Sequence, residues 1–235
     1  MTDAIHAFWR RLDQPGHDAA RLSRTPSGWA LEGYAAFHEH GPTGLRYRLQ
    51  LAPDFATVSA TIEGQRSGDP FAHQFRRSGD EWELDGAPVP GLGDLVHLDF
   101  GFSPATNLQQ LRHARLAVGE ETAIPAAWFD IGEATLIRLP QRYRRIAEDR
   151  YWYSSPESDY EAVLEMAENG FVRRYPGLWE WRPATERLRR GGGALRLRSC
   201  PDAPLPRNVR SCSPAWRRRW FTSRCASPRS SRRCG

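Results

Sequence analysis

Two segments rich in arginine and tyrosine, QRYRR at 141–145 and DRYWYSS at 149–155, hold the side chains best suited to binding a ligand. Guanidinium groups and phenol hydroxyls suit a phosphate, carboxylate or sugar head group, and aromatic rings stack on sugar faces. Arginine and tyrosine also form ordinary cross-strand pairs on a sheet surface, so both interpretations stay open. The candidates that alternate along these segments are Arg142, Tyr143, Arg144, Tyr151 and Tyr153.

An acid-base site is a second possibility. His97 and Asp99 alternate opposite the apolar face of a predicted strand, and Asp130 follows Trp128 and Phe129. A carboxylate and an imidazole could therefore meet across a sheet and transfer protons. The simpler interpretation is that these residues are solvated on the outer face of the sheet.

Metal and cofactor chemistry has little support in the sequence. His38 and His40 are two apart on a possible strand, but no third ligand is evident, so surface histidines are the simpler interpretation. The chain has no nucleophile elbow, P-loop, dinucleotide-binding turn or H-E-x-x-H helix. We therefore expect no cofactor and no metal site, and we favour a binding protein over an enzyme.

The segments that must position these residues have the period of β-strands. Leu45, Tyr47, Leu49 and Leu51 alternate with polar residues, which is typical of a half-buried strand. Short stretches of Gly, Pro and Asp between such segments predict turns. The strands that the alternation predicts are 45–51, 57–62, 71–76, 81–85, 96–102, 114–118, 123–131, 134–139 and 142–153.

The last predicted hairpin and the helices have distinct signals. Residues 160–166 alternate before the turn dipeptide Asn169-Gly170, which predicts a return strand from Phe171. Helical spacing occurs at residues 5–12, and Ser103 followed by Pro104 predicts the start of a helix that includes residues 108 and 111. A sheet this large must close, fold over or wrap around a helix, so we expect a mainly β barrel, roll or sandwich.

An ordered series of short segments resembles the bacterial glycolipid-binding family with the spiral β-roll fold. The likeness covers residues 5–182, and the order of the segments is more specific than any one of them. They are FWRRLD (8–13), WALEGYA (29–35), YRLQL (47–51), LVHLDFGF followed by SPATN (95–107), QRYRR (141–145) and YPGLW (175–179). After Asn107 the chain has LQQLRHARL, which departs from the family pattern, so the resemblance implies no role for Arg112 or its neighbours.

This resemblance implies a many-stranded antiparallel spiral β-roll wrapped around a single helix, a homodimer, and a likeness to periplasmic lipoprotein carriers. It adds Thr106 and Asn107 of SPATN as ligand-binding candidates. In YPGLW, Tyr175 and Trp179 either anchor the Pro-Gly turn to the core or line a ligand cavity.

Composition changes sharply near Arg182. Residues 1–182 hold 19 arginines, 26 acidic residues and no lysine, a net charge of −7, whereas residues 183–235 hold 14 arginines and two acidic residues, a net charge of +12. All four cysteines lie beyond the break, without zinc-binding spacing. We therefore predict a β-roll domain at 1–182 and a disordered Arg/Ser/Pro/Cys-rich tail at 183–235, which is a frameshifted terminus, a genuine tail or a nucleic-acid arm.

These observations favour a non-catalytic protein that binds an amphipathic molecule such as a glycolipid. The first alternative is a hydrolase or isomerase that uses Asp99 with His97. The second is nucleic-acid binding through the tail, and we favour a nucleic acid less than an amphipathic molecule as the partner. No secretory signal and no run of about 18 apolar residues is present. We expect a cytoplasmic protein without integral membrane insertion.

Overall fold

One antiparallel sheet of fourteen strands dominates the computed structural model, which describes residues 4–39 and 41–182. Eight strands follow one another from the N-terminal side, each paired with the next. They are β1 (Ile5–Arg11), β2 (Gly16–Thr25), β3 (Gly28–His38), β4 (Pro42–Leu51), β5 (Thr57–Arg66), β6 (Asp69–Ser78), β7 (Glu81–Leu84) and β8 (Ala87–Val89).

A second run of strands completes this sheet from the other end of the described chain. Its members are β13 (Arg142–Ala147), β14 (Arg150–Ser155), β15 (Tyr160–Met166), β16 (Val172–Tyr175) and β17 (Trp179–Trp181), and β10 (Glu121–Ala123) pairs with β13. Strand β1 pairs with β17, with Trp9 opposite Trp181, so the two runs are continuous. The sheet is not closed into a barrel: β8 and β10 are its edges.

The segment between the two runs holds the helix and a small second sheet. A 3₁₀ turn, η1 (Pro104–Thr106), leads into α1 (Asn107–Ala114), and a further 3₁₀ turn, η2 (Pro156–Ser158), follows β14. The hydroxyl of Ser103 accepts a hydrogen bond from the Ala105 amide, which confirms the predicted helix start. The small sheet has the order β12 (Thr135–Leu139), β11 (Ala126–Asp130), β9 (Leu98–Phe100), and β9 and β11 are parallel.

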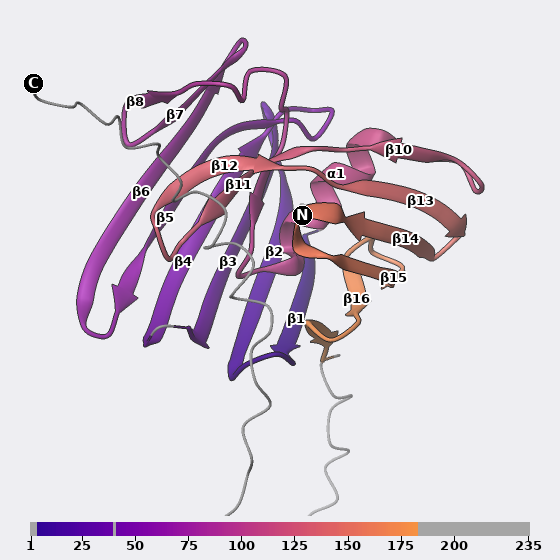
Figure 1. The fold of residues 1–235 in the computed structure, drawn as a ribbon, viewed down its shortest axis with the longest axis horizontal. Helices are drawn as coiled ribbons and strands as arrows, with labels where there is room; N and C mark the ends of the chain where they lie inside the picture. The colour runs from indigo at the N-terminus through magenta and orange to yellow at the C-terminus, as the bar shows by residue number, and fades with distance from the viewer. Residues whose placement is uncertain (1–3, 40, 183–235) are drawn as a thin grey trace, which may run out of the picture. The chain divides into compact units, whose positions relative to one another are not determined.

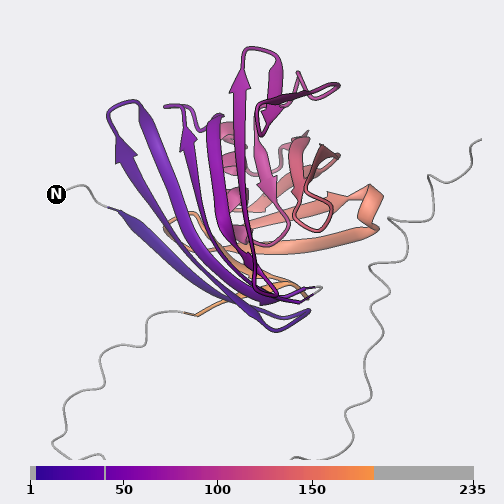
Figure 2. The same ribbon diagram turned by 90° about the vertical axis from the view of Figure 1, so that its left-hand side faces the viewer.

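Helix α1 lies against the inner surface of the curved strands β1–β6, between them and β13–β15 (Figures 1 and 2). Its residues from Asn107 to Leu111 are all buried. Large side chains share one hydrophobic core with Leu108 and Leu111 of the helix, and those at most 2% exposed include Trp9, Trp82, Tyr143, Phe75, Phe100, Phe102, Phe129 and Phe171. For residues 4–39 and 41–182, the predicted mainly β roll wrapped around a single helix is thus confirmed.

Three local predictions are wrong. Residues 5–11 form β1 and not a helix, because Ala7 and Trp9 are buried while Phe8 is 45% exposed, which is the alternation of a strand. Residues 114–118 form no strand, since they contain the end of α1 and a turn. The predicted strand 142–153 is two strands, β13 and β14, with a turn at Glu148 and Asp149. The hairpin of β15 and β16 around Asn169-Gly170 is confirmed.

Some sequence predictions concern residues outside the described part of the chain. Residues 183–235, for which we predicted disorder, a frameshift or a nucleic-acid arm, lie outside the described part. His40 of the possible histidine pair lies outside it too. Within residues 4–39 and 41–182, no three His, Cys, Asp or Glu side chains gather into a group that could hold a metal ion. The same residues include no helix long and apolar enough to cross a membrane.

Candidate functional site

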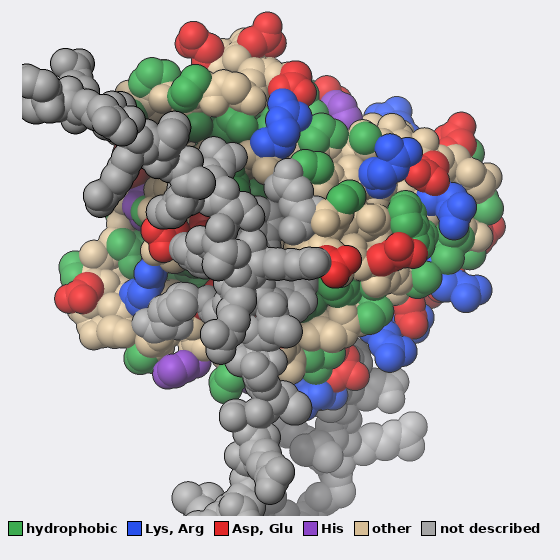
Figure 3. Space-filling model, in the orientation of Figure 1, with side chains coloured by type: hydrophobic (Ala, Val, Ile, Leu, Met, Phe, Trp, Pro, Cys, Tyr) green, Lys and Arg blue, Asp and Glu red, His purple; other side chains and the backbone are tan. Residues whose placement is uncertain are grey.

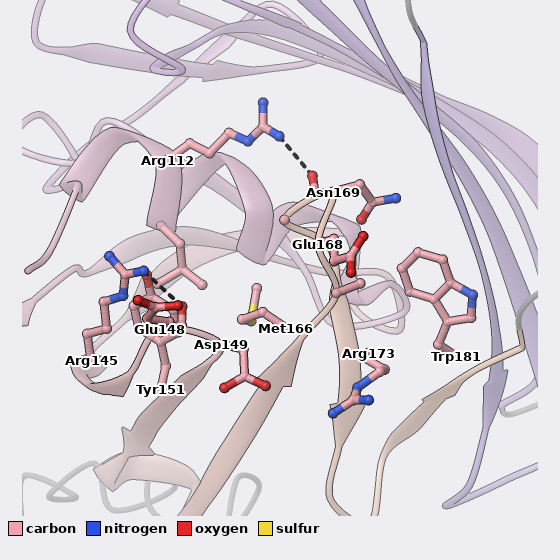
Figure 4. A pocket seen from close by; sticks show the side chains of 13 residues that line it. Arg112, Arg145, Glu148, Asp149, Tyr151, Met166, Glu168, Asn169, Arg173 and Trp181 are labelled. Carbon is pink, nitrogen blue, oxygen red and sulfur yellow. Dashed lines mark hydrogen bonds between the residues drawn. The ribbon is translucent and has the colours of Figure 1, made fainter. Parts of the chain in front are cut away.

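A pocket of about 880 Å³ opens at the C-terminal end of α1 (Figure 4). The last turns of α1, the β13–β14 turn, the β15–β16 turn and β17 contribute its walls. Its lining residues are Leu111, Arg112, Arg145, Glu148, Asp149, Tyr151, Met166, Ala167, Glu168, Asn169, Gly170, Arg173 and Trp181.

The floor of this pocket is apolar. Leu111, Tyr151 and Met166 are buried, and Trp181 is half-buried. Tyr151 and Met166 face inward because each lies on the buried side of an alternating strand, and the amide of Met166 donates to the Asp149 carbonyl at 2.8 Å. The floor can therefore take up the apolar part of a ligand.

Charged side chains surround the floor. The guanidinium of Arg145 donates to the carbonyl oxygens of Leu116 at 3.0 Å and Glu148 at 2.8 Å, and it lies 5.7 Å from the centre of the Tyr151 ring. Arg173 pairs with Glu165 at 2.8 Å. The side chains of Glu148, Asp149 and Glu168 belong to exposed residues at the rim. An apolar floor with a charged rim suits an amphipathic molecule.

Farther inside, a buried polar cluster lies between α1 and β13. Asn107 Nδ2 donates to the Tyr143 hydroxyl at 2.8 Å, Gln141 Nε2 donates to Gln110 Oε1 at 2.6 Å, and Tyr143 donates to the same oxygen at 3.2 Å. We define the polar cluster as Asp99, Thr106, Asn107, Gln110, Gln141 and Tyr143, all of which are buried.

The ionisable members of this cluster are shifted toward their neutral forms. Asp99 accepts a hydrogen bond from Thr106 Oγ1, and burial raises the pKa of its carboxyl to about 6. Burial likewise raises the pKa of Tyr143 well above its ordinary value. Tyr143 packs against Tyr153 with ring centres 4.9 Å apart, and Tyr153 packs against Tyr175 at 5.6 Å.

A second buried polar group ties β2, β4 and the start of the helical segment together. The Tyr47 hydroxyl donates to Asp18 Oδ2 at 3.0 Å and lies 3.1 Å from Ser103 Oγ, and Ser103 also donates to Asp18. Burial raises the pKa of Asp18 to about 7. Asp18 and Ser103 are not among the residues that line the pocket.

The structure brings together many of the residues that the sequence predicted as ligand contacts. Thr106, Asn107 and Tyr143 belong to the polar cluster, and Tyr153 and Tyr175 pack beside it, all without lining the pocket. Tyr151 lines the pocket. Since Tyr151 and Tyr153 are on the same face of β14, the pocket and the polar cluster are consecutive parts of one inner surface.

The other candidates occupy structural positions. Arg142 is exposed and pairs with Glu121 at 2.8 Å, and Arg144 lies 5.5 Å from the centre of the Trp152 ring. Arginine and acidic side chains are interspersed over the β13–β15 part of the surface (Figure 3). Trp179 is buried, and the Arg11 guanidinium lies 5.3 Å from its ring centre. These contacts agree with the structural interpretation of the sequence, in which the arginines form cross-strand pairs and Trp179 anchors a turn to the core.

The predicted polar face of strand 96–102 is wrong. His97 and Asp99 are both buried, because β9 is covered on two sides by the rest of the fold. The His97 ring packs edge-on against His113, with centres 4.9 Å apart, whereas Asp99 bonds to Thr106. Asp130 accepts the amide of Gly132 at 2.7 Å and so stabilises a turn. No contact joins these three residues into an acid-base site in the described structure.

Sequence reasoning missed Leu111, Arg112, Met166 and Trp181. These residues are distant in sequence, and they meet only because β1 pairs with β17 and α1 packs inside the sheet. The Asn169-Gly170 turn was the one signal available, since it brings β15 and β16 to the rim.

Comparison with known proteins decides the family. A family model described as "Putative glycolipid-binding" matches residues 6–181. The chain belongs to this glycolipid-binding family. It is also similar to the crystal structure of a DUF1089 family protein from Pseudomonas aeruginosa, with 25% identity and a TM-score of 0.63, over 70% of this chain and 91% of that chain. Among curated proteins no match was found. The pocket of this family member lies wholly within the matched residues.

Proposed function

We propose that the chain is a non-catalytic binding protein for an amphipathic molecule such as a glycolipid, and that the pocket at the end of α1 is its binding site. The observation that carries this proposal is the pairing of an apolar floor with a charged rim in one cavity of about 880 Å³. Small-molecule sites commonly have about 300–1,000 Å³ and a few polar groups that orient the ligand. The family description points to the same ligand class.

The energetics of such binding need no catalytic residues. Burying each methylene of an acyl chain contributes about 0.8 kcal/mol before ordering costs, so a few methylenes on the floor give useful affinity. Polar groups at the rim then determine which head group binds. The buried carboxylates of Asp18 and Asp99 do not line the pocket, which gives the hydrolase or isomerase alternative no support there.

The proposal also covers the oligomeric state, the cellular location and the domain boundary. The family resemblance supports a homodimer, and the composition break supports a binding domain that ends near Arg182. We further propose a cytoplasmic location. Analytical ultracentrifugation of the full chain tests the dimer, and a monomer at all concentrations contradicts it.

Calorimetry with alkyl glucosides of increasing chain length tests the binding site. In the full chain below the micelle concentration, we expect each added methylene to tighten binding about fourfold, the equivalent of about 0.8 kcal/mol. Trp181→Ala removes part of the pocket wall and should weaken binding about tenfold, which corresponds to some 50 Å² of lost apolar contact. Trp152→Ala is the matched control, because Trp152 is also half-buried on a strand but does not line the pocket. Equal effects of both variants, or no dependence on chain length, contradict the proposal.

A further inference from the structure

Arg112 lines the pocket, and its one hydrogen bond to the described residues has an uncharged acceptor. Its Nη2 donates to the Asn169 carbonyl at 2.8 Å, and its guanidinium lies 5.3 Å from the centre of the Phe55 ring. An arginine side chain has five N–H donors. Among the described residues, the Asn169 carbonyl is the one hydrogen-bond acceptor that Arg112 reaches, so most of its donors remain for another molecule.

Arg112 also lacks a counter-ion. No carboxylate of the described residues forms an ion pair with it, although the residue is half-buried. Burial lowers the pKa of this guanidinium from its ordinary value, with no nearby negative charge to oppose the effect. Removing a cation from water without a counter-ion is unfavourable, and an anion brought by a ligand would compensate it.

The alternative is that Arg112 only stabilises the C-terminus of α1, where cations interact favourably with the helix dipole. However, its hydrogen bond goes to Asn169 in the β15–β16 turn and not to a carbonyl at the end of α1. The amide of Arg115 already satisfies the Leu111 carbonyl at 3.1 Å. Stabilisation of the C-terminus of α1 therefore does not explain where the Arg112 side chain lies.

The acceptor that holds Arg112 is itself fixed. Asn169 Oδ1 accepts from the Phe171 amide at 3.1 Å, and Asn169 Nδ2 donates to the His6 carbonyl at 3.0 Å. The guanidinium is thus oriented before any ligand arrives, which reduces the entropy lost on binding. In contrast, Arg145 is occupied by backbone carbonyls and Arg173 by Glu165.

The charged side chains around the pocket can orient a bound head group. Glu148 and Asp149 lie across the pocket from Arg112, whereas Glu168 belongs to the turn that Arg112 contacts (Figure 4). Carboxylates repel an anion but accept hydrogen bonds from sugar hydroxyls. A head group with both an acidic group and hydroxyls would therefore place its acidic group at Arg112.

We propose that the ligand carries an acidic oxygen group, a carboxylate or a phosphate, on a hydroxyl-bearing head group, and that Arg112 binds this group. The inference rests on the proposed function, because it assigns the head-group chemistry of the same pocket. Arginine recognises either oxyanion through paired N–H donors.

Three probes test the inference by calorimetry on the full chain: octyl β-D-glucoside, octyl β-D-glucuronide and octyl phosphate. The glucuronide has a carboxylate in place of the C6 hydroxymethyl group of the glucoside, and we expect it to bind about ten to a hundred times more tightly, as a charge-assisted hydrogen bond predicts. Arg112→Gln should weaken glucuronide binding by a larger factor than glucoside binding, so that the variant no longer distinguishes the two ligands. Octyl phosphate distinguishes a phosphate preference from a carboxylate preference.

Arg142→Gln is the matched control, since Arg142 is exposed and paired with Glu121 outside the pocket. Urea unfolding of each variant establishes that it is folded. Equal affinity for glucoside and glucuronide, or an equal loss of both in Arg112→Gln, overturns the inference and leaves the proposed function intact. If none of the probes binds, both the inference and the proposed function fail.

Discussion

The phenol ring of Tyr47 crosses β3 directly over Gly33. The two residues are opposite each other in the β3–β4 register, and a Cβ added to Gly33 would be 2.2 Å from Tyr47 Cζ. The missing side chain lets the Tyr47 hydroxyl reach Asp18 on β2 and Ser103 before the helical segment. One glycine in the WALEGYA segment thus permits the contact that connects the long strands to the helix.

Gly33→Ala should destabilise the protein. The new methyl group must displace the buried Tyr47 ring, and overpacking of this kind costs about 1–3 kcal/mol. The free energy of unfolding in urea measures the effect. Gly44→Ala on the adjacent β4 is the control, because nothing lies within 4 Å of the added Cβ there. Similar losses in both variants would contradict the role of the Tyr47 ring.

Asp18→Asn should reduce the decrease in stability between pH 4 and pH 8. The folded-state pKa of Asp18, about 7, is above its ordinary value of 3.8, so the folded state binds the proton more tightly. The stabilisation is complete below about pH 4 and is lost as pH rises through 7, by up to about 4 kcal/mol. Unfolding curves measured across this range test the prediction. An unchanged pH slope in the variant would refute it.

His97→Leu should change the pH dependence in the opposite sense. Burial, with a smaller effect of His113, lowers the pKa of His97 to about 3, so the folded state resists its protonation. Stability is therefore lost as pH falls from about 6.5 toward 3, when the unfolded chain takes up the proton. The leucine variant lacks this loss. Because neither ring nitrogen of His97 has a partner among the described residues, we also expect a gain of about 1 kcal/mol at pH 7.

The sequence predicted the sheet well where one face is buried and the other is in water. Leu45, Tyr47, Leu49 and Leu51 show this alternation, and all four are buried in β4. The prediction failed at residues 5–11, where apolar residues on both faces imitate helical spacing. There the strand is specified by pairing with β2 and β17, and a local pattern does not contain that pairing.

The site was predicted in part for a similar reason. Tyr143, Tyr151 and Tyr153 followed from strand periodicity, which places them on one inner face. One part of that face lines the pocket, and the next part belongs to the buried polar cluster. Packing against α1 determines which part stays open. No sequence pattern could show that Arg112 would lie beside Asn169, 57 positions away, without an acidic partner.

Gly170→Ala should weaken binding of octyl β-D-glucuronide more than it weakens the fold. Gly170 has φ of +88°, so an alanine there costs about 1–2 kcal/mol of backbone strain, and its Cβ would be 3.3 Å from Arg112 Nη2. Gly177→Ala is the matched control, with φ of +73° and nothing within 4 Å of the added Cβ. We expect similar losses of unfolding free energy in the two variants but reduced glucuronide affinity only in Gly170→Ala. If both variants keep full affinity, the guanidinium position does not control binding, and Arg112 acts at most as a structural contact of the turn.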